Sequence, residues 1–139
     1  MARILALDYG KKRTGIAVTD PLKIIATALD TVATDQLIGY LKKYFSTETV
    51  ELVVIGYPLN FDDTSTHATP LVDKFIPKFK HVFPHIPIVT WDERMTSQMA
   101  AQTIAQLGLR KKDREQKERL DAVSAAIILQ EYLAAHPTP

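Results

Sequence analysis

The chain contains no cysteine, which excludes disulfide bonds, cysteine-ligated zinc and iron–sulfur clusters. This absence fits a reducing cytoplasm, which is where we expect the protein to act. No run of eighteen apolar residues occurs, so the sequence predicts no membrane span, and the N-terminus lacks the layout of a signal peptide. The net charge is only +1 at pH 7. No basic field therefore covers the whole molecule, and any binding of nucleic acid must use local patches.

Glycine is also sparse, and the positions of the histidines and glycines exclude two further kinds of site. The four histidines are scattered without the spacing of a zinc site. The five glycines form no Walker-type phosphate loop. The rest of the composition is ordinary for a globular protein, with 46% apolar and 24% charged residues. A length of 139 residues predicts one domain over residues 1–139, large enough to bury a sizeable core.

The chain opens with an apolar run that ends in Asp8, turns through a glycine and three cations, and becomes apolar again. This pattern predicts a hairpin of strands over residues 3–8 and 14–19. A carboxylate at the end of a central strand is costly unless a hydrogen-bond network, a cation such as Arg13 or a bound metal ion neutralises it. The metal ion is our hypothesis. The alternative is a turn residue or an ion-pair partner, as most strand-end aspartates are.

The remaining segments predict a third strand and then alternating helices and strands. Short connections near the N-terminus favour an antiparallel meander, and the later β-branched runs are typical of strands covered on both faces. The predicted fold class is therefore α/β, with a mixed five-stranded sheet, a three-strand antiparallel meander plus two parallel strands, flanked by helices. The expected elements are strands over 23–30, 50–56 and 86–93, helices over 35–45, 68–82 (kinked or ended by Pro77) and 96–107, and an amphipathic helix over 117–135 with Leu120, Val123, Ile127, Ile128 and Leu133.

Four acidic or polar features should meet where the first strand ends: Asp8, segments 56–60 and 92–94, and Asp121. Right-handed crossovers bring the carboxyl ends of parallel strands to one edge, where sites form in open α/β sheets. Carboxylates gathered there would repel one another without a cation. Mg²⁺ or Mn²⁺ accepts oxygen ligands and keeps waters for chemistry, and two such ions about 4 Å apart can drive phosphodiester hydrolysis. The pattern therefore permits a metal-dependent phosphodiesterase.

Each acid also has a plain structural explanation. Asp92 and Glu93 can cap the helix that follows them, and Asp121 favours the start of a helix. Strand alternation sends Asp92 and Glu93 to opposite faces, so we favour Glu93 as the ligand and keep Asp92 in reserve. Lys12 and Arg13 in the opening turn are placed to hold substrate phosphates.

Taken together and in order, these motifs closely resemble the bacterial YqgF/RuvX family over nearly the whole chain. The resemblance implies an RNase H-like fold of the Holliday junction resolvase type. It also implies a nuclease role, either in processing the 5′ end of pre-16S ribosomal RNA or in resolving branched DNA. Asp8 and Asp121 match the family's first and last catalytic acids, and the middle acid falls in the 92–94 motif. The matching segments are 8–20 (DYGKKRTGIAVTD), 56–60 (GYPLN), 92–97 (DERMTS) and 120–130 (LDAVSAAIILQ), and the chain departs at Asp63, where the family usually carries glycine.

We therefore expect a Mg²⁺- or Mn²⁺-dependent endonuclease, a hydrolase of ester bonds, in which Asp8, Glu93 and Asp121 are the catalytic metal ligands. Its expected partners are pre-rRNA or branched DNA, and ribosomal particles in addition. We expect no membrane association, and either a monomer or a homodimer. A noncatalytic nucleic-acid- or ribosome-binding module is the main alternative, and a nucleotide phosphohydrolase is disfavoured because 139 residues supply no second lobe. RNA and DNA offer the same phosphodiester, so the sequence does not choose between them. The expected substrate-binding residues are Lys12, Arg13, Asn60 and Arg94.

Overall fold

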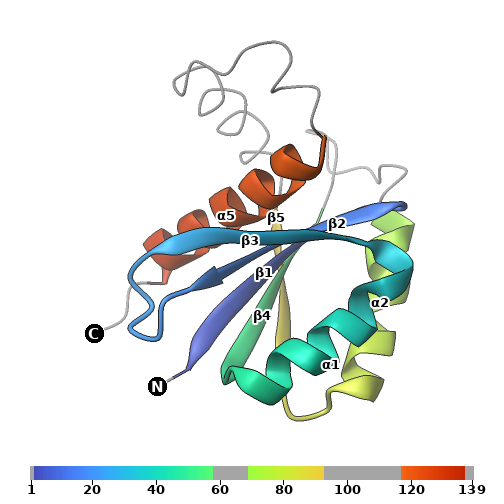
Figure 1. The fold of residues 1–139 in the computed structure, drawn as a ribbon, viewed down its shortest axis with the longest axis horizontal. Helices are drawn as coiled ribbons and strands as arrows, with labels where there is room; N and C mark the ends of the chain where they lie inside the picture. The colour runs from blue at the N-terminus through green and yellow to red at the C-terminus, as the bar shows by residue number, and fades with distance from the viewer. Residues whose placement is uncertain (1, 58–68, 93–116, 137–139) are drawn as a thin grey trace.

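The structure is a computed structural model that describes residues 2–57, 69–92 and 117–136. The described residues form a sheet with helices on both of its faces (Figure 1). None of these helices combines the length and the apolar character needed to cross a bilayer. In chain order the elements are β1 (Arg3–Tyr9), β2 (Arg13–Thr19), β3 (Ala26–Ala33), the 3₁₀ turn η1 (Thr34–Gln36), α1 (Leu37–Thr47), β4 (Val50–Tyr57), α2 (Thr69–Val82), β5 (Ile88–Asp92) and α5 (Lys117–Ala135).

The five strands lie in the order β3-β2-β1-β4-β5. β1 pairs with β2, and β2 with β3, in antiparallel fashion, whereas β4 runs parallel to both β1 and β5. The predicted mixed sheet, a three-strand meander plus two parallel strands, is confirmed. As a result β1 lies at the centre of the sheet, and its carboxyl end lies beside the carboxyl end of β4.

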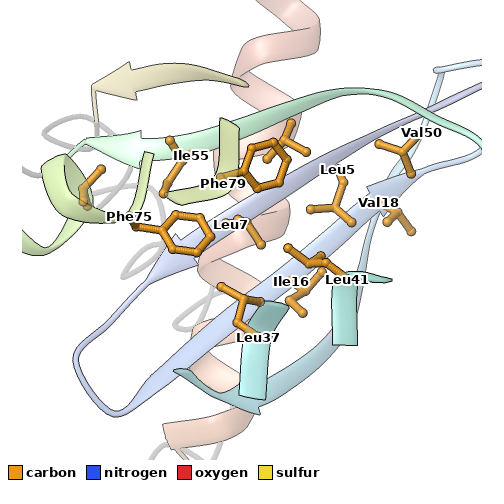
Figure 2. Packing of buried hydrophobic residues seen from close by; sticks show 12 residues of the cluster. Leu5, Leu7, Ile16, Val18, Leu37, Leu41, Val50, Ile55, Phe75 and Phe79 are labelled. Carbon is orange, nitrogen blue, oxygen red and sulfur yellow. The ribbon is translucent and has the colours of Figure 1, made fainter. Parts of the chain in front are cut away.

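A first hydrophobic core fills the space between the sheet and the helices α1 and α2. Alternate residues of β1 and β2 point to this face, as strand geometry requires. Aromatic rings from α2 close the core, with the Phe75 and Phe79 ring centroids 6.1 Å apart. Figure 2 shows the central members of this core, which are Leu5, Leu7, Ile16, Val18, Leu37, Leu41, Val50, Ile55, Phe75 and Phe79.

A second core lies under α5 on the opposite face of the sheet and is built largely from small side chains. Alanines supply most of the sheet's contribution, and short side chains allow a helix to pack close to the strands beneath it. Its fully or nearly fully buried members are Ile4, Ala6, Ala17, Ala26 and Val54 from the strands and Ala125, Ile128 and Leu129 from α5.

The third strand begins later than the sequence predicts, and the cause is one side chain. β3 starts at Ala26 rather than at residue 23. The Asp20 carboxylate accepts hydrogen bonds from the backbone N–H groups of Leu22, Ile24 and Ile25, at 3.2, 2.8 and 2.8 Å. These N–H groups are thereby held in a turn, and the apolar pair at 24–25 is exposed instead of entering the sheet.

The two long helices differ in part from their predictions. α2 continues through Pro77 to Val82, because Pro77 and Asp73 both lie on the exposed side, where water can bond to the carbonyl that proline leaves without a donor. α5 has the predicted bounds, but Ala122, Ala125 and Leu129 are buried in addition to the predicted isoleucines. The predicted helix over 96–107 lies outside the described residues.

Candidate metal-dependent nuclease site

Asp8 lies near the carboxyl end of the central strand, on the face that α5 covers. Within β1, Ile4 and Ala6 belong to the core under α5, and alternation assigns Asp8 to the same face. Its partner across the antiparallel pair is Gly15. On the other side of β1, Leu7 is paired with Ile55 of β4. The next residue of β4, Gly56, therefore lies beside Asp8. Asp8 therefore has a glycine next to it on each neighbouring strand, and neither contributes a side chain that would crowd the carboxylate.

Asp121 is brought to the same place by the packing of α5 on Gly15. A Cβ atom built on Gly15 would lie 1.9 Å from the carbonyl oxygen of Asp121 and 2.8 Å from the backbone nitrogen of Ala122. The helix backbone thus occupies the space above Gly15 that a side chain would need. Because Gly15 is also the cross-strand partner of Asp8, the structure brings Asp8 and Asp121 to the same end of the same face.

Arg13 forms an ion pair with Asp121. Its Nε lies 3.3 Å from Oδ2 of Asp121 in an ion pair whose two side chains are 38% and 30% exposed. Arg13 and Gly15 are two residues apart in β2 and so point to the same face. The neighbouring Lys11 and Lys12 are exposed at the turn. The hairpin turn that follows β1 therefore carries three positive charges, and one of them, Arg13, contacts Asp121.

The turn that carries these cations is fixed by threonines rather than left loose. The Thr34 hydroxyl donates a 2.6 Å hydrogen bond to the Gly10 carbonyl and lies 2.9 Å from the hydroxyl of the fully buried Thr14. The Thr34 backbone N–H donates to the Lys12 carbonyl at 3.0 Å. A Cβ on Gly10 would lie 2.4 Å from the Arg13 carbonyl oxygen, so the turn needs glycine there. These hydrogen bonds tie the backbone of the basic turn to the first residue of η1.

β5 approaches the same edge with Trp91 on the α5 face. Trp91 packs against the core under α5, and its Nε1 donates a 3.1 Å hydrogen bond to Glu131 of α5. The next residue, Asp92, is paired with Tyr57, a residue that packs against the first core on the opposite face. The structure therefore places Asp92 in the row that faces away from Asp8.

Several predicted site residues lie outside the described residues: Asn60, Glu93 and Arg94. Within the described ranges, no three histidine, aspartate or glutamate side chains form a group that could hold a metal ion. The two acids brought together there are Asp8 and Asp121. Their carboxylate oxygens are the ligands that Mg²⁺ and Mn²⁺ prefer, so the donor set fits such an ion.

Sequence reasoning missed the roles of Gly15, Gly56 and Thr34. The signal for the two glycines was present, because an isolated glycine inside a strand often marks a close approach of another backbone or a ligand. Thr34 has no local signal. Its role depends on η1 folding back against the hairpin turn.

Comparison with known proteins gives concordant results. A family model described as RuvX, Holliday junction resolvase, matches residues 2–135. A relative from Flavobacterium psychrophilum, named "Putative pre-16S rRNA nuclease", is 49% identical over 96% of this chain and 97% of its own length. A relative of the same name from Christiangramia forsetii is 50% identical, with 96% and 98% coverage. Among solved structures, T. thermophilus RuvC in complex with a Holliday junction substrate matches with a TM-score of 0.57 and 13% identity, over 99% of this chain and 98% of that one. The predicted RNase H-like fold is thereby confirmed.

Proposed function

Because the chain belongs to the RuvX family of Holliday junction resolvases, we propose that it is a metal-dependent endonuclease that hydrolyses phosphodiester bonds in the precursor of 16S ribosomal RNA. One observation carries this proposal. The backbone of α5 rests on Gly15, and this contact brings Asp121 beside Asp8 at the carboxyl end of the central strand. Two carboxylates at that position need a cation, and a divalent ion supplies it together with the chemistry.

Asp8 and Asp121 would hold the metal, with Glu93 as the third ligand. Trp91 lies on the α5 face and Asp92 in the opposite row, so continuing the alternation of β5 by one residue would carry Glu93 toward Asp8. This supports Glu93 over Asp92. When bound, Mg²⁺ or Mn²⁺ activates a water and stabilises charge on the phosphate that is attacked.

The positive turn would bind the substrate backbone. Arg13 contacts Asp121 and Lys12 precedes it in the turn, so the two cations would neutralise phosphates on either side of the scissile bond. The contacts of Thr34 hold these residues in place, so little conformational entropy is lost when substrate binds. Asn60 and Arg94, which follow β4 and β5 in the sequence, are proposed to complete the substrate site. We place the reaction in the cytoplasm, on pre-rRNA either free or within ribosomal particles.

A second candidate is the resolution of four-way DNA junctions. It is favoured by the description of the matching family and by the likeness in fold to RuvC. Symmetric cutting of a junction requires two active sites, and hence a homodimer, whereas a single cut in RNA requires only a monomer. The two candidates therefore differ in substrate and in the oligomeric state that each needs.

The test offers both substrates side by side to the purified protein, with Mg²⁺ or Mn²⁺, and measures molecular mass by light scattering. We expect metal-dependent cleavage of the RNA. Asp8→Asn and Asp121→Asn should each lower the rate at least a hundredfold, since even residues behind metal ligands typically contribute about 10- to 100-fold. Glu93→Gln should act likewise, whereas Asp92→Asn should retain cleavage. Asp73→Asn, which changes an exposed acid on the far face, is the matched control.

Each contrary outcome has a distinct meaning. Retained metal-dependent cleavage in Asp8→Asn would rule out the acid site. Cleavage of the DNA junction alone, by a dimer, would replace the first candidate with the second. Binding that weakens steeply with salt, without cleavage in either metal, would identify a noncatalytic nucleic-acid-binding module.

A further inference from the structure

The ion pair between Arg13 and Asp121 follows directly from the fold. The backbone of α5 lies directly against Gly15. Arg13 lies two residues before Gly15 in β2 and therefore points to the same face of the sheet. The Arg13 guanidinium is thus held beside Asp121, in the second turn of α5. Its Nε reaches Oδ2 of Asp121 at 3.3 Å.

This contact gives one of the two acids, Asp121, a cationic partner within the protein. Asp8 and Asp121 lie at the same end of one face, and such carboxylates repel one another unless a positive charge compensates. We propose that Arg13 is the internal counterion of Asp121 in the metal-free protein and that a divalent ion displaces it on binding. The inference rests on the proposed function, because it concerns the same metal site.

The geometry of the pair suits a contact that must be broken. It joins one nitrogen to one oxygen at 3.3 Å, with both side chains partly exposed, and pairs of this kind are weak. Arg3 provides a contrast within the same molecule. Its Nη1 donates to the Thr19 carbonyl at 2.9 Å while its Nε contacts Glu48 at 3.3 Å, so two separate contacts hold it. Among the described residues, Arg13 has Asp121 as its hydrogen-bond partner and is held by that one contact.

Displacement by the metal ion would also free Arg13 to contact the substrate. The released guanidinium stays on the hairpin that carries the exposed Lys11 and Lys12, where it can bind a substrate phosphate. Metal binding would thus add a phosphate ligand to the substrate site. The two binding events should therefore be coupled, each strengthening the other.

The experiment measures metal binding without substrate. Binding of Mn²⁺ alone is followed by electron paramagnetic resonance for the wild type, Arg13→Gln and the matched control Lys12→Gln, which removes the same charge from the adjacent residue. We expect Arg13→Gln to bind Mn²⁺ about two- to fivefold tighter, the range that an exposed ion pair supports, and Lys12→Gln to change affinity by less than about 1.5-fold.

A second measurement uses the wild-type side chain and so does not depend on the folding of Arg13→Gln. The Arg13 Nε–Hε signal is followed by NMR while Mg²⁺ is added, with Asp121→Asn as the reference for a broken pair. We expect Mg²⁺ to move the signal to its position in Asp121→Asn. If Mg²⁺ binds but the signal stays in place and both glutamine variants bind Mn²⁺ equally, Arg13 is not displaced and the inference is wrong, while the metal site stands. If the wild type binds neither ion, the metal site itself is refuted and the inference falls with it.

Discussion

The carbonyl oxygen of Asp121 lies where the side chain of any residue other than glycine at position 15 would project, with 1.9 Å between that oxygen and a Cβ built on Gly15. Gly15→Ala must therefore push α5 away from β2. We expect a loss of about 1–3 kcal/mol in the free energy of unfolding, as for overpacked cores, together with a large fall in cleavage rate as Asp121 moves. Urea unfolding and the RNA assay measure the two effects.

Gly39 gives the control for this prediction. It lies on the exposed side of α1, and a Cβ there would meet nothing within 4 Å. Gly39→Ala should raise stability by about 0.5–1 kcal/mol, because alanine favours helix, and should leave cleavage unchanged. If Gly15→Ala proves as harmless as Gly39→Ala, the close contact of α5 with β2 does not exist in solution.

The hydroxyl of Thr34 should matter for both stability and substrate binding. Thr34→Val removes the hydrogen bond to the Gly10 carbonyl and leaves the buried Thr14 hydroxyl without this partner, at a cost of about 1–3 kcal/mol. Substrate affinity should fall because the basic turn is less fixed, while its dependence on salt stays unchanged. Thr34→Ser keeps the hydroxyl and should behave like the wild type in unfolding and binding assays.

Lys12 should contribute to substrate binding through charge. For Lys12→Gln we expect the slope of log affinity against log salt concentration to become shallower by about 0.7–0.9, the value for one phosphate contact. Lys80→Gln, which removes a charge from the exposed last turn of α2, should leave the slope unaltered. Equal slopes for both variants would mean that the hairpin turn does not contact the nucleic-acid backbone.

Tyr40 should make the protein less stable at high pH. Partial burial, and then the nearby Asp30 carboxylate, raise the pKa of Tyr40 to about 12. An unfolded chain releases the tyrosine proton near pH 10, so between pH 10 and 12 the unfolded state binds fewer protons than the native one. The free energy of unfolding is therefore undiminished below pH 10 and falls as pH rises through this window. Denaturant titrations should show a smaller fall for Tyr40→Phe. Some fall should remain, because burial also raises the pKa of Tyr44.

Much of the fold could be predicted because its elements carry local signals. The hairpin, β4 and the bounds of α5 follow from periodicity in the sequence, and the structure agrees. The start of β3 could not be predicted in this way. Ile24 and Ile25 read as strand residues, yet the Asp20 carboxylate holds their N–H groups in a turn. A side chain that accepts hydrogen bonds from backbone N–H groups can override a hydrophobic pattern. The identity of the neighbouring residues does not predict whether such hydrogen bonds form.

The candidate site could be predicted as a set of acids but not as an arrangement. Asp8 and Asp121 can be recognised in the sequence because each carboxylate lies at the end of an apolar segment. That they share one end of one face depends on where α5 crosses the sheet, which Gly15 controls. The preference for Glu93 over Asp92 stays a prediction, because Glu93 lies outside the described residues. The face of Trp91, which supports this preference, comes from the tertiary structure.

The alanine layer beneath α5 makes the distance between Asp8 and Asp121 sensitive to residues that line neither side of the proposed metal site. Ala6 is paired with Ala17, and Asp8 with Gly15, so the two pairs follow one another on the face that α5 covers. A single extra methylene in this layer would push α5 away from the sheet and widen the gap between the two acids that the proposed metal ion would bridge. Loss of nuclease activity can therefore arise from conservative apolar changes, in a protein whose acids and basic turn are all intact.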